Sequence, residues 1–537
     1  MLLRLCLLAA AAVLSAGDWD PIVASPPPKD RWTTYHAQLA KGPLWRVAVA
    51  TAFGSPDHEE FLAVGQLADG RIAAFGNAHG PAFATAPAPL VLGRGTHLGK
   101  TPTRTDAKQK VHLRPENPDC AGFVVLYAPD ASAVRKVVRF DWGVASLTTG
   151  AVTADGRGLL LSGRATPAFA AAAGAGLRRR PGGSGAYAFD GTACSGDVYV
   201  LRLDPERGAI EWAWVLDANG DPPSRLFTDR TGAVWFDAKG LHRISPDGAE
   251  LKTISTMTGS GTADWLGVDP DGSGAYYGGD RNTRTRREPW RQPYLYRFDR
   301  EGAKQWTLYE APPGDVGSDH GGLESDSAVR GMAVLPDGDT VFTGWSDGAN
   351  TVFQRHADNW KRNCPVLGFG MTPWWPKGAN AYAHLMVIDT RTRTTKGHVW
   401  WCGYLPEHFA DPAYRNRTAG AFIDHIAALP DGGVVFGGRS ASGLLQTPGA
   451  FWTDPRTGEK YGGSTLVVYA PRFAGLRFSS YLPGCSTVRV AATASGAVAV
   501  SASVGRDSAK VPTPSPSVRA LSPHQGGTDG HLILLAP

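Results

Sequence analysis

The 537-residue chain lacks the short motifs that identify the common catalytic and cofactor-binding sites. It contains no zinc-binding helix motif, no phosphate-binding loop, no dinucleotide-binding fingerprint and no serine-nucleophile elbow in a suitable context. It also lacks a nucleic-acid-binding motif, and a formal net charge of +5 is too small on this length to indicate nucleic acid. These absences leave no cofactor, no metal and no nucleic-acid partner to predict.

Long hydrophobic runs are missing too, apart from one at the start of the chain. Residues 1–17 have the features of a secretory signal peptide, because Arg4 is followed by the apolar stretch 5–14 and then by small residues. This stretch is well short of the ~20 residues that span a bilayer, and no later one is longer, so we predict no transmembrane helix. Cys6 lies too early for a lipid-anchored cysteine. We therefore expect a secreted or periplasmic protein.

Helix signals are few, whereas turn formers are plentiful. The chain has 66 glycine and 40 proline residues, with 42% hydrophobic and only 19% charged residues, which is typical of a turn-rich β protein. Its length exceeds what one hydrophobic core usually serves, so several domains or a repeat architecture are expected. Internal repeats in the sequence favour the repeat architecture.

One hairpin pattern recurs seven times along the chain. Each copy has apolar residues, an Asp-Gly-like turn, an alternating apolar strand and a small residue, and the turns centre on Asp69-Gly70, Asp155-Gly156, Thr231-Gly232, Asp271-Gly272, Asp337-Gly338, Asp431-Gly432 and Ser495-Gly496. Glycine accepts a positive φ and aspartate can bond the nearby backbone, so each copy predicts a two-stranded hairpin. The first six copies are each followed by a second hairpin, as in residues 201–212 and 296–306. Two hairpins form a four-stranded unit.

Seven four-stranded units predict an all-β fold, a seven-bladed β-propeller with four-stranded blades. The last unit lacks one strand, because the chain stops after residues 531–537, where related strands upstream turn and continue. The aromatic-bearing segment 43–49 has the character of the missing strand. We therefore expect the N- and C-terminal strands to share one blade, which removes an open sheet edge. The predicted domains are the signal peptide 1–17, a lead-in segment 18–42 and a single propeller 43–537.

The hairpin sequence Leu429-Pro-Asp-Gly-Gly433 is one that the blades of secreted bacterial β-propeller repeat proteins often carry. Over nearly the whole chain after the predicted signal peptide, the protein resembles this class. The resemblance implies a scaffold alone, because members of the class include ligand binders, adhesion modules and enzymes. It implies no catalytic residue.

The units are longer than lean propeller blades, and the surplus falls mostly between their second and third strands. These insertions are residues 77–120, 164–196, 280–293, 345–383, 439–464 and 504–530. Alternating strand direction places the insertions and the links between blades on one face of the disc, which we call the insertion-rich face. The Asp-Gly turns lie on the opposite face, which we call the turn face. A ligand is expected on the insertion-rich face.

Basic and aromatic side chains gather in the insertions of the fourth and fifth units. Guanidinium groups can hold an acidic polymer through paired hydrogen bonds, and tryptophan rings can stack on the apolar faces of sugars. The predicted ligand-binding residues are Arg284, Arg286, Arg287, Trp290, Trp374 and Trp375. A further basic stretch, residues 177–180, lies in the second unit. Two alternatives stay open: a solvated basic loop, and a small tryptophan core that keeps its loop folded.

The densest set of titratable groups lies in the link between the fourth and fifth units. His320, Glu324 and Asp326 are candidates for acid–base catalysis or for binding a divalent cation, and Tyr382 is a further catalytic candidate. Their spacing matches no established metal motif. A polar turn closed by local hydrogen bonds is the alternative interpretation.

Five cysteines follow the predicted signal peptide, and in an oxidising compartment they can pair. Cys120 and Cys194 each precede a third strand, while Cys402 and Cys485 each follow a fourth strand, so we predict these two disulfides. The odd number leaves at least one free thiol or an intermolecular bond. Reduced, buried cysteines are the alternative.

The first functional hypothesis is a monomeric, non-enzymatic propeller that binds an extracellular glycan or a partner protein on the insertion-rich face. The rival is a polysaccharide lyase or glycoside hydrolase acting on an acidic glycan, and a structural surface component is a third possibility. Convergence of the His320 link with the arginines of residues 280–293 at the channel mouth would favour the enzyme.

Overall fold

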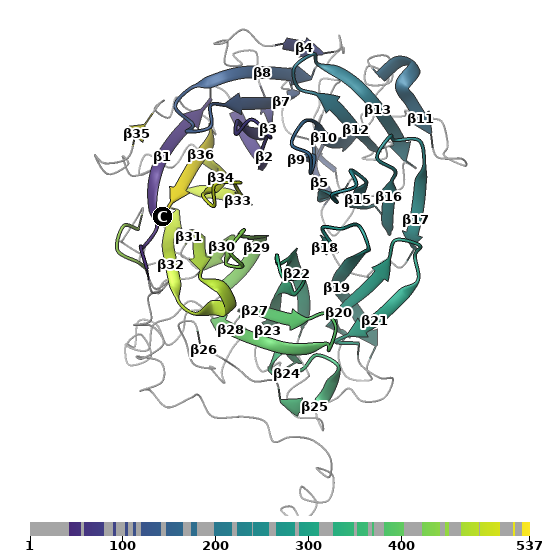
Figure 1. Ribbon diagram of the computed structural model, residues 1–537, viewed down its shortest axis with the longest axis vertical. Coiled ribbons are helices and arrows are strands. Elements are labelled where there is room, and N and C mark those ends of the chain that lie inside the picture. The colour runs from purple at the N-terminus through teal and green to yellow at the C-terminus, as the bar shows by residue number, and fades with distance from the viewer. Residues whose placement is uncertain are drawn as a thin grey trace, which may run out of the picture.

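The computed structural model describes residues 42–54, 58–79, 90–92, 102–105, 111–113, 120–140, 147–164, 173–179, 198–216, 223–238, 240–256, 265–284, 289–310, 326–347, 352–363, 368–369, 381–401, 421–440, 446–450, 463–482, 484–504, 519–520 and 529–537. Within them the chain is almost entirely β, and seven sheets with four core strands each are arranged as blades around a central axis (Figure 1). The predicted seven-bladed β-propeller is confirmed. The predicted signal peptide and nearly all of the lead-in segment lie outside these residues.

Each blade is an antiparallel meander whose first strand lines the channel and whose fourth strand lies toward the rim (Figure 1). Blade 1 consists of β2 (His58–Gln66), β3 (Ile72–His79), β7 (Cys120–Tyr127) and β8 (Val134–Phe140). Blade 2 consists of β9 (Thr149–Val152), β10 (Leu159–Arg164), β12 (Val198–Asp204) and β13 (Ala209–Leu216). Blade 3 consists of β14 (Leu226–Thr228), β15 (Val234–Asp237), β16 (Leu241–Ile244) and β17 (Leu251–Ser255).

The remaining blades follow the same order. Blade 4 consists of β18 (Trp265–Val268), β19 (Gly274–Arg284), β20 (Pro289–Asp299) and β21 (Lys304–Leu308), and blade 5 of β22 (Ser327–Val334), β23 (Thr340–Asp347), β27 (Ala381–Asp389) and β28 (Thr394–Trp401). Blade 6 consists of β29 (Ala421–Ala428), β30 (Val434–Ser440), β31 (Gly463–Tyr469) and β32 (Leu476–Leu482). Blade 7 is composite: β33 (Cys485–Ala492), β34 (Val498–Val504) and β36 (Asp529–Ala536) are joined by β1 (Arg46–Phe53).

Blade 7 closes the ring, because β1 pairs antiparallel with β36 and the two ends of the described chain lie side by side (Figure 1). Arg46 lies opposite Ala536 at one end of this ladder. Val47 and Ile533 bury their side chains in one apolar cluster with residues of blade 6. The predicted closure by the N- and C-terminal strands is confirmed, and hydrophobic contacts to the preceding blade stabilise it.

The hydrophobic core lies between neighbouring blades, as β7 illustrates. Val124 and Leu126 pack in a cluster with blade 2, whereas Phe123, Val125 and Tyr127 pack in a cluster with blade 7. All five side chains are buried. Successive side chains on a strand point to opposite faces, so a strand covered on both faces is apolar at every position. This packing explains the continuous apolar runs of the third strands.

The Asp-Gly turns have the predicted chemistry. Gly432 has a φ of 85°, in the region that favours glycine, and Asp431 Oδ1 accepts the N–H of Gly433 at 2.9 Å. Asp69 Oδ1 accepts the N–H of Arg71 in the same way at 3.0 Å. Each turn therefore ends the first strand at a defined residue. This sets a common register for the side chains that face the channel.

The insertions add strands that the sequence pattern does not predict. In the part of the insertions that the structure describes, four blades gain a short fifth strand parallel to their outermost one: β4 (Leu90–Leu92) on β8, β11 (Leu177–Arg179) on β13, β26 (Gly368–Phe369) on β28 and β35 (Arg519–Ala520) on β1. Two separate pairs are β5 (Pro102–Thr105) with β6 (Val111–Leu113) and β24 (Arg355–His356) with β25 (Asn359–Asn363). In blade 4 the pairing of β19 and β20 continues to Arg284 opposite Pro289, so most of the insertion 280–293 is strand.

Among the described residues, the helical elements are short 3-10 helices: η1 (Gly174–Gly176), η3 (Val352–Gln354) and η5 (Pro471–Phe473). In the part of the chain that the structure describes, no helix has the length and apolar character needed to cross a membrane.

Candidate functional site

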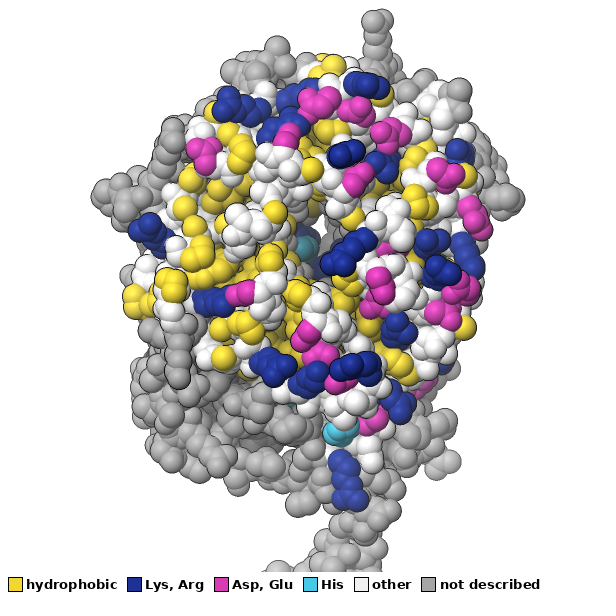
Figure 2. All heavy atoms as spheres, in the orientation of Figure 1, with side chains coloured by type: hydrophobic (Ala, Val, Ile, Leu, Met, Phe, Trp, Pro, Cys, Tyr) yellow, Lys and Arg dark blue, Asp and Glu magenta, His cyan; other side chains and the backbone are white. Residues whose placement is uncertain are grey.

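The first strands of the seven blades surround a channel along the axis of the disc. A cavity of about 520 Å³ lies in it, lined mainly by small and apolar residues of β2, β9, β14, β18, β22, β29 and β33. Figure 2 shows an opening in the middle of one face of the molecule. Basic and acidic side chains are interspersed over the face around this opening. Among the lining residues, the charged or titratable ones are Arg225, His425 and Arg489.

Arg225 directly precedes β14, and only 6% of its surface is exposed. Its Nη2 donates a hydrogen bond to the backbone oxygen of Asp424 at 3.1 Å, and its guanidinium carbon lies 3.9 Å from the centre of the Trp265 ring. Burial lowers the pKa of Arg225 well below its usual range, and the positive charge of Arg489 lowers it further. The carboxylates of Asp237 and Asp424 partly oppose this shift.

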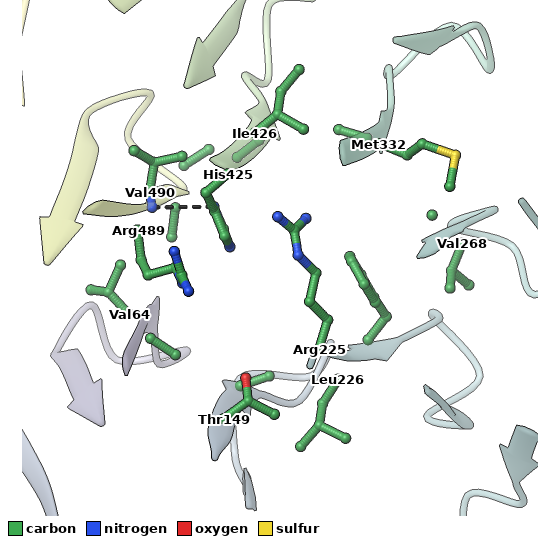
Figure 3. Close-up of a pocket in the computed structure, with 18 of the residues that line it drawn as sticks. Val64, Thr149, Arg225, Leu226, Val268, Met332, His425, Ile426, Arg489 and Val490 are labelled. Carbon is green, nitrogen blue, oxygen red and sulfur yellow. Dashed lines mark hydrogen bonds between the residues drawn. The ribbon is translucent and has the colours of Figure 1, made fainter. Parts of the chain in front are cut away.

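His425 of β29 and Arg489 of β33 face the same space as Arg225. Figure 3 shows the three side chains converging on the channel from blades 6, 7 and 3. Nδ1 of His425 accepts the backbone N–H of Val490 at 3.3 Å. Burial, followed by the charges of Arg225 and Arg489, lowers the pKa of His425 well below its usual range, so its imidazole is neutral at pH 7. Burial also lowers the pKa of Arg489.

A stack of aromatic rings and guanidinium groups in blades 5 and 6 lies outside the residues that line the cavity and is linked to them through Asp424. The rings of Trp345 and Phe422 stack with centroids 6.1 Å apart. Arg330 lies 5.6 Å from the Trp345 centroid, and Arg439 lies 5.3 Å from the Phe422 centroid. Arg439 Nε is also ion-paired with Asp424 Oδ2 at 3.2 Å, whereas burial lowers the pKa of Arg330. Each cation–π contact stabilises its arginine by about 0.5 to 2 kcal/mol.

The basic groups lie toward the end of the channel at which the first strands begin. Each first strand runs from that end to its Asp-Gly-like turn at the other end. Arg225 stands before the first residue of β14, and His425 lies in the middle of β29, whereas Ala427 and Ala428 end that strand. The channel is therefore cationic where the first strands begin and apolar near the turns.

Three of these arginines, Arg225, Arg330 and Arg489, form no ion pair with any residue that the structure describes. The arrangement differs from that near the turns, where Arg297 Nη2 lies 2.8 Å from Asp269 Oδ2. A guanidinium group removed from water without an acid partner is costly. Because these side chains offer only donors and positive charge, the site matches a carboxylate or sulfate group.

Most of the site residues predicted from the sequence lie outside the residues and side chains that the structure describes. These are Arg286, Arg287, Trp374, Trp375, His320, Glu324 and the side chains of Arg284, Trp290 and Tyr382. Asp326 is described, and its Oδ1 accepts the backbone N–H of Arg291 at 2.8 Å, which ties the link between blades 4 and 5 to β20. The predicted convergence of these residues stays a prediction. Across the described side chains, no group of three His, Cys, Asp or Glu is placed to hold a metal ion.

Cys485 is a free thiol in the structure, so the predicted disulfide with Cys402 is not formed in it. Cys485 is half-buried, and desolvation raises the pKa of its thiol to about 12. The structure does not describe Cys402, Cys194 or the side chain of Cys120. The Cys120–Cys194 disulfide stays a prediction.

The channel residues are not found by searching for dense clusters of charge, because each is a single residue within or directly before a first strand of its blade. Their common feature is their distance from the turn: Arg225, Trp265, His425 and Arg489 each lie seven residues before the turn glycine of their hairpin, which is Gly232, Gly272, Gly432 and Gly496. Aligning the hairpins on these glycines brings the four residues into one column. That column contains two arginines and a histidine that line the channel, and a tryptophan that contacts one of the arginines.

The fold and the channel together define a seven-bladed β-propeller with a basic channel end. No family model matches the chain, and no curated protein matches its sequence. Solved structures with a similar fold include the β-propeller domain of the Trilobed protease from Pyrococcus furiosus, with 7% identity, a TM-score of 0.37, and coverage of 83% of this chain and 92% of that one.

Two further solved structures are bacterial. The periplasmic gluconolactonase PpgL from Pseudomonas aeruginosa has 13% identity and a TM-score of 0.32, covering 78% of this chain and 95% of that one. TolB from Acinetobacter baumannii has 11% identity and a TM-score of 0.31, covering 64% of this chain and 61% of that one. These likenesses concern the fold alone and carry no argument about function.

Proposed function

We propose that this protein binds an acidic glycan at the basic end of its channel and does not catalyse a reaction. The observation that carries the proposal is Arg225, a guanidinium group buried in the channel wall without a carboxylate partner among the described residues. Arg489 adds a second cationic donor to the cavity lining, and Arg330 lies outside the lining. Trp265 lies beside Arg225 and Trp345 beside Arg330. An acidic sugar offers a carboxylate or sulfate group to the guanidinium groups and an apolar ring face to an indole.

A bound anion would supply the counter-charge that these arginines lack in the described structure. Exposed charges act over about one Debye length, which is ~8 Å at physiological ionic strength, so binding should weaken as salt is added. The insertion-rich face is the proposed entrance, and the arginines and tryptophans of the insertions remain candidates for further contacts there. A location outside the cytoplasm is proposed from residues 1–17 alone.

A lyase or hydrolase acting on the same class of glycan is the second candidate. One observation favours it: His425 is held neutral beside Arg225 and Arg489 in the same cavity. A neutral imidazole next to groups that neutralise a carboxylate suits proton abstraction from a uronate if the ring nitrogen that faces the cavity carries the lone pair. The two candidates share a ligand class and differ in whether the ligand is cleaved.

A glycan array probed with the protein lacking residues 1–17, together with a turnover assay on uronate-containing polymers, separates the two candidates. We expect binding to uronate or sulfated glycans, no binding to neutral glycans of the same length, and no release of shorter products. Equal binding of neutral glycans would overturn the anion-binding proposal. Product release that is lost in the His425→Leu variant would support the enzyme instead.

A further inference from the structure

We infer that His425 binds the anionic group of the ligand as a neutral hydrogen-bond donor, in a cradle that it forms with Arg225 and Arg489. The inference rests on the proposed function and names the group that is recognised, a fully ionised carboxylate or sulfate of the glycan. It assigns His425 to binding and removes it from proton transfer.

The backbone determines which ring nitrogen of His425 carries the proton. The amide of Val490 is a donor under all conditions, and it lies 3.3 Å from Nδ1 of His425. Nδ1 must therefore act as the acceptor, so the neutral imidazole carries its proton on Nε2. Figure 3 shows the ring directed into the channel, away from this hydrogen bond. A general base acting in the cavity would need a lone pair on Nε2, and this tautomer has none there.

The charges around the ring keep it neutral. The groups that face His425 or act on its neighbours are Arg225 before β14, Arg489 on β33, Asp424 on its own strand, Arg330 on β22, Arg439 on β30 and Asp237 on β15. Arg439 is ion-paired with Asp424, and the arginines that act directly on the His425 ring are Arg225 and Arg489. Both disfavour a positive charge on the ring. A proton on Nδ1 would also point at the N–H of Val490. The Nε2–H therefore remains a donor between pH 6 and 8.

The cradle consists of donors from three blades. The two guanidinium groups cannot accept a hydrogen bond, and Nε2–H of His425 donates. Arg225 also donates to the backbone oxygen of Asp424, which fixes the orientation of its guanidinium group before a ligand arrives. An oxyanion can accept from all three groups and neutralise charge. The hydroxyl group of a neutral sugar can also accept hydrogen bonds but leaves both arginines without a counter-charge.

Calorimetric titration with two oligosaccharides tests the inference and identifies the group that is bound. One oligosaccharide carries sulfates and no carboxylates, the other carboxylates and no sulfates. The wild type, His425→Gln and His425→Leu are compared at pH 6, 7 and 8, because glutamine can place an N–H near the position of Nε2 and leucine cannot. We expect wild-type affinity for the bound oligosaccharide to vary less than about threefold over this range, glutamine to stay within about threefold of the wild type, and leucine to lose about tenfold.

Two results would overturn the role of His425 while leaving glycan binding intact. One is an affinity that rises steeply as the pH falls from 8 to 6, because the protonated ring would then be the binding form. The other is a leucine variant that binds as tightly as the wild type. If the wild type binds neither oligosaccharide, the proposed function itself fails, and this is seen before any variant is compared.

The tautomer of His425 can also be measured in the absence of a ligand. Long-range ¹H–¹⁵N NMR spectra of protein labelled in its histidines distinguish protonated from unprotonated ring nitrogens, and the His425→Gln variant identifies the signal. We expect protonated Nε2 and unprotonated Nδ1 at pH 7. The opposite tautomer would overturn the inference even if acidic glycans bind.

Discussion

A fall in pH from 7.5 to 5 should destabilise the protein through two buried histidines of blade 5. His384 of β27 and His398 of β28 stack with ring centroids 5.3 Å apart, and His384 Nδ1 lies 3.0 Å from His398 Nε2. His384 Nε2 lies 2.8 Å from Ser346 Oγ. Burial lowers the pKa of His398 to about 3, and burial together with His398 lowers the pKa of His384 well below its usual range.

The sign of the effect follows from the direction of these shifts. A histidine whose pKa is lower in the folded state contributes stability that is fully present above its unfolded pKa of ~6.5. This stability is lost as the pH falls from ~6.5 toward 3, because the unfolded chain binds a proton that the folded chain does not. Each pH unit in this window corresponds to about 1.4 kcal/mol, so His398 alone should cost about 2 kcal/mol at pH 5.

Urea unfolding of the wild type and of His398→Gln at pH 7.5, 6 and 5 measures this contribution. The variant is expected to be less stable at pH 7.5, because it disturbs a buried hydrogen bond to His384. Between pH 7.5 and 5 the wild type should lose about 2 kcal/mol more than the variant does, since the variant has no imidazole at this position. Equal losses in both proteins would refute the reasoning, because the folded state would then not exclude a proton at His398.

Three further outcomes are expected. Arg225→Met should keep or raise the thermal midpoint while weakening glycan binding, because it removes a buried charge without an acid partner; a midpoint several degrees lower would contradict this. Gly150→Ala should lower the free energy of unfolding by about 1 to 3 kcal/mol, because a methyl group there overlaps the Phe75 ring, and an unchanged urea midpoint would count against it. Removal of residues 529–537 should cause aggregation on size-exclusion chromatography, because β1 and β34 lose their shared partner; a monomer as stable as the full chain would disprove this.

The blade count and the closure of the ring could be predicted because both depend on local signals that repeat. An Asp-Gly turn such as Asp431-Gly432 marks a hairpin wherever it occurs, and a strand at residues 531–537 without a following partner implies one elsewhere. The short fifth strands could not be predicted in this way. Leu177–Arg179 is too short to show a strand period, and its pairing with β13 depends on the path of the insertion around the rim.

The basic lining of the channel could not be predicted from sequence patterns either, for a different reason. Binding residues usually lie in loops, so dense charge in long insertions such as 280–293 attracts attention first. Arg225, His425 and Arg489 are instead isolated residues at the start or in the middle of apolar strands. These residues lie close together only in the closed ring of blades, which brings the same strand position from several distant strands to one axis. Charge density along the chain cannot show this proximity.

Binding of an anion by the channel arginines is tested most directly by titrating one acidic oligosaccharide from the array into the wild type, Arg225→Gln and Arg207→Gln. The Arg207 side chain is 84% exposed in the turn between β12 and β13, so its variant removes the same charge far from the channel. We predict that Arg225→Gln weakens binding at least about tenfold and reduces its salt dependence, whereas Arg207→Gln binds as the wild type does. Equal affinities of all three proteins would contradict binding at the channel.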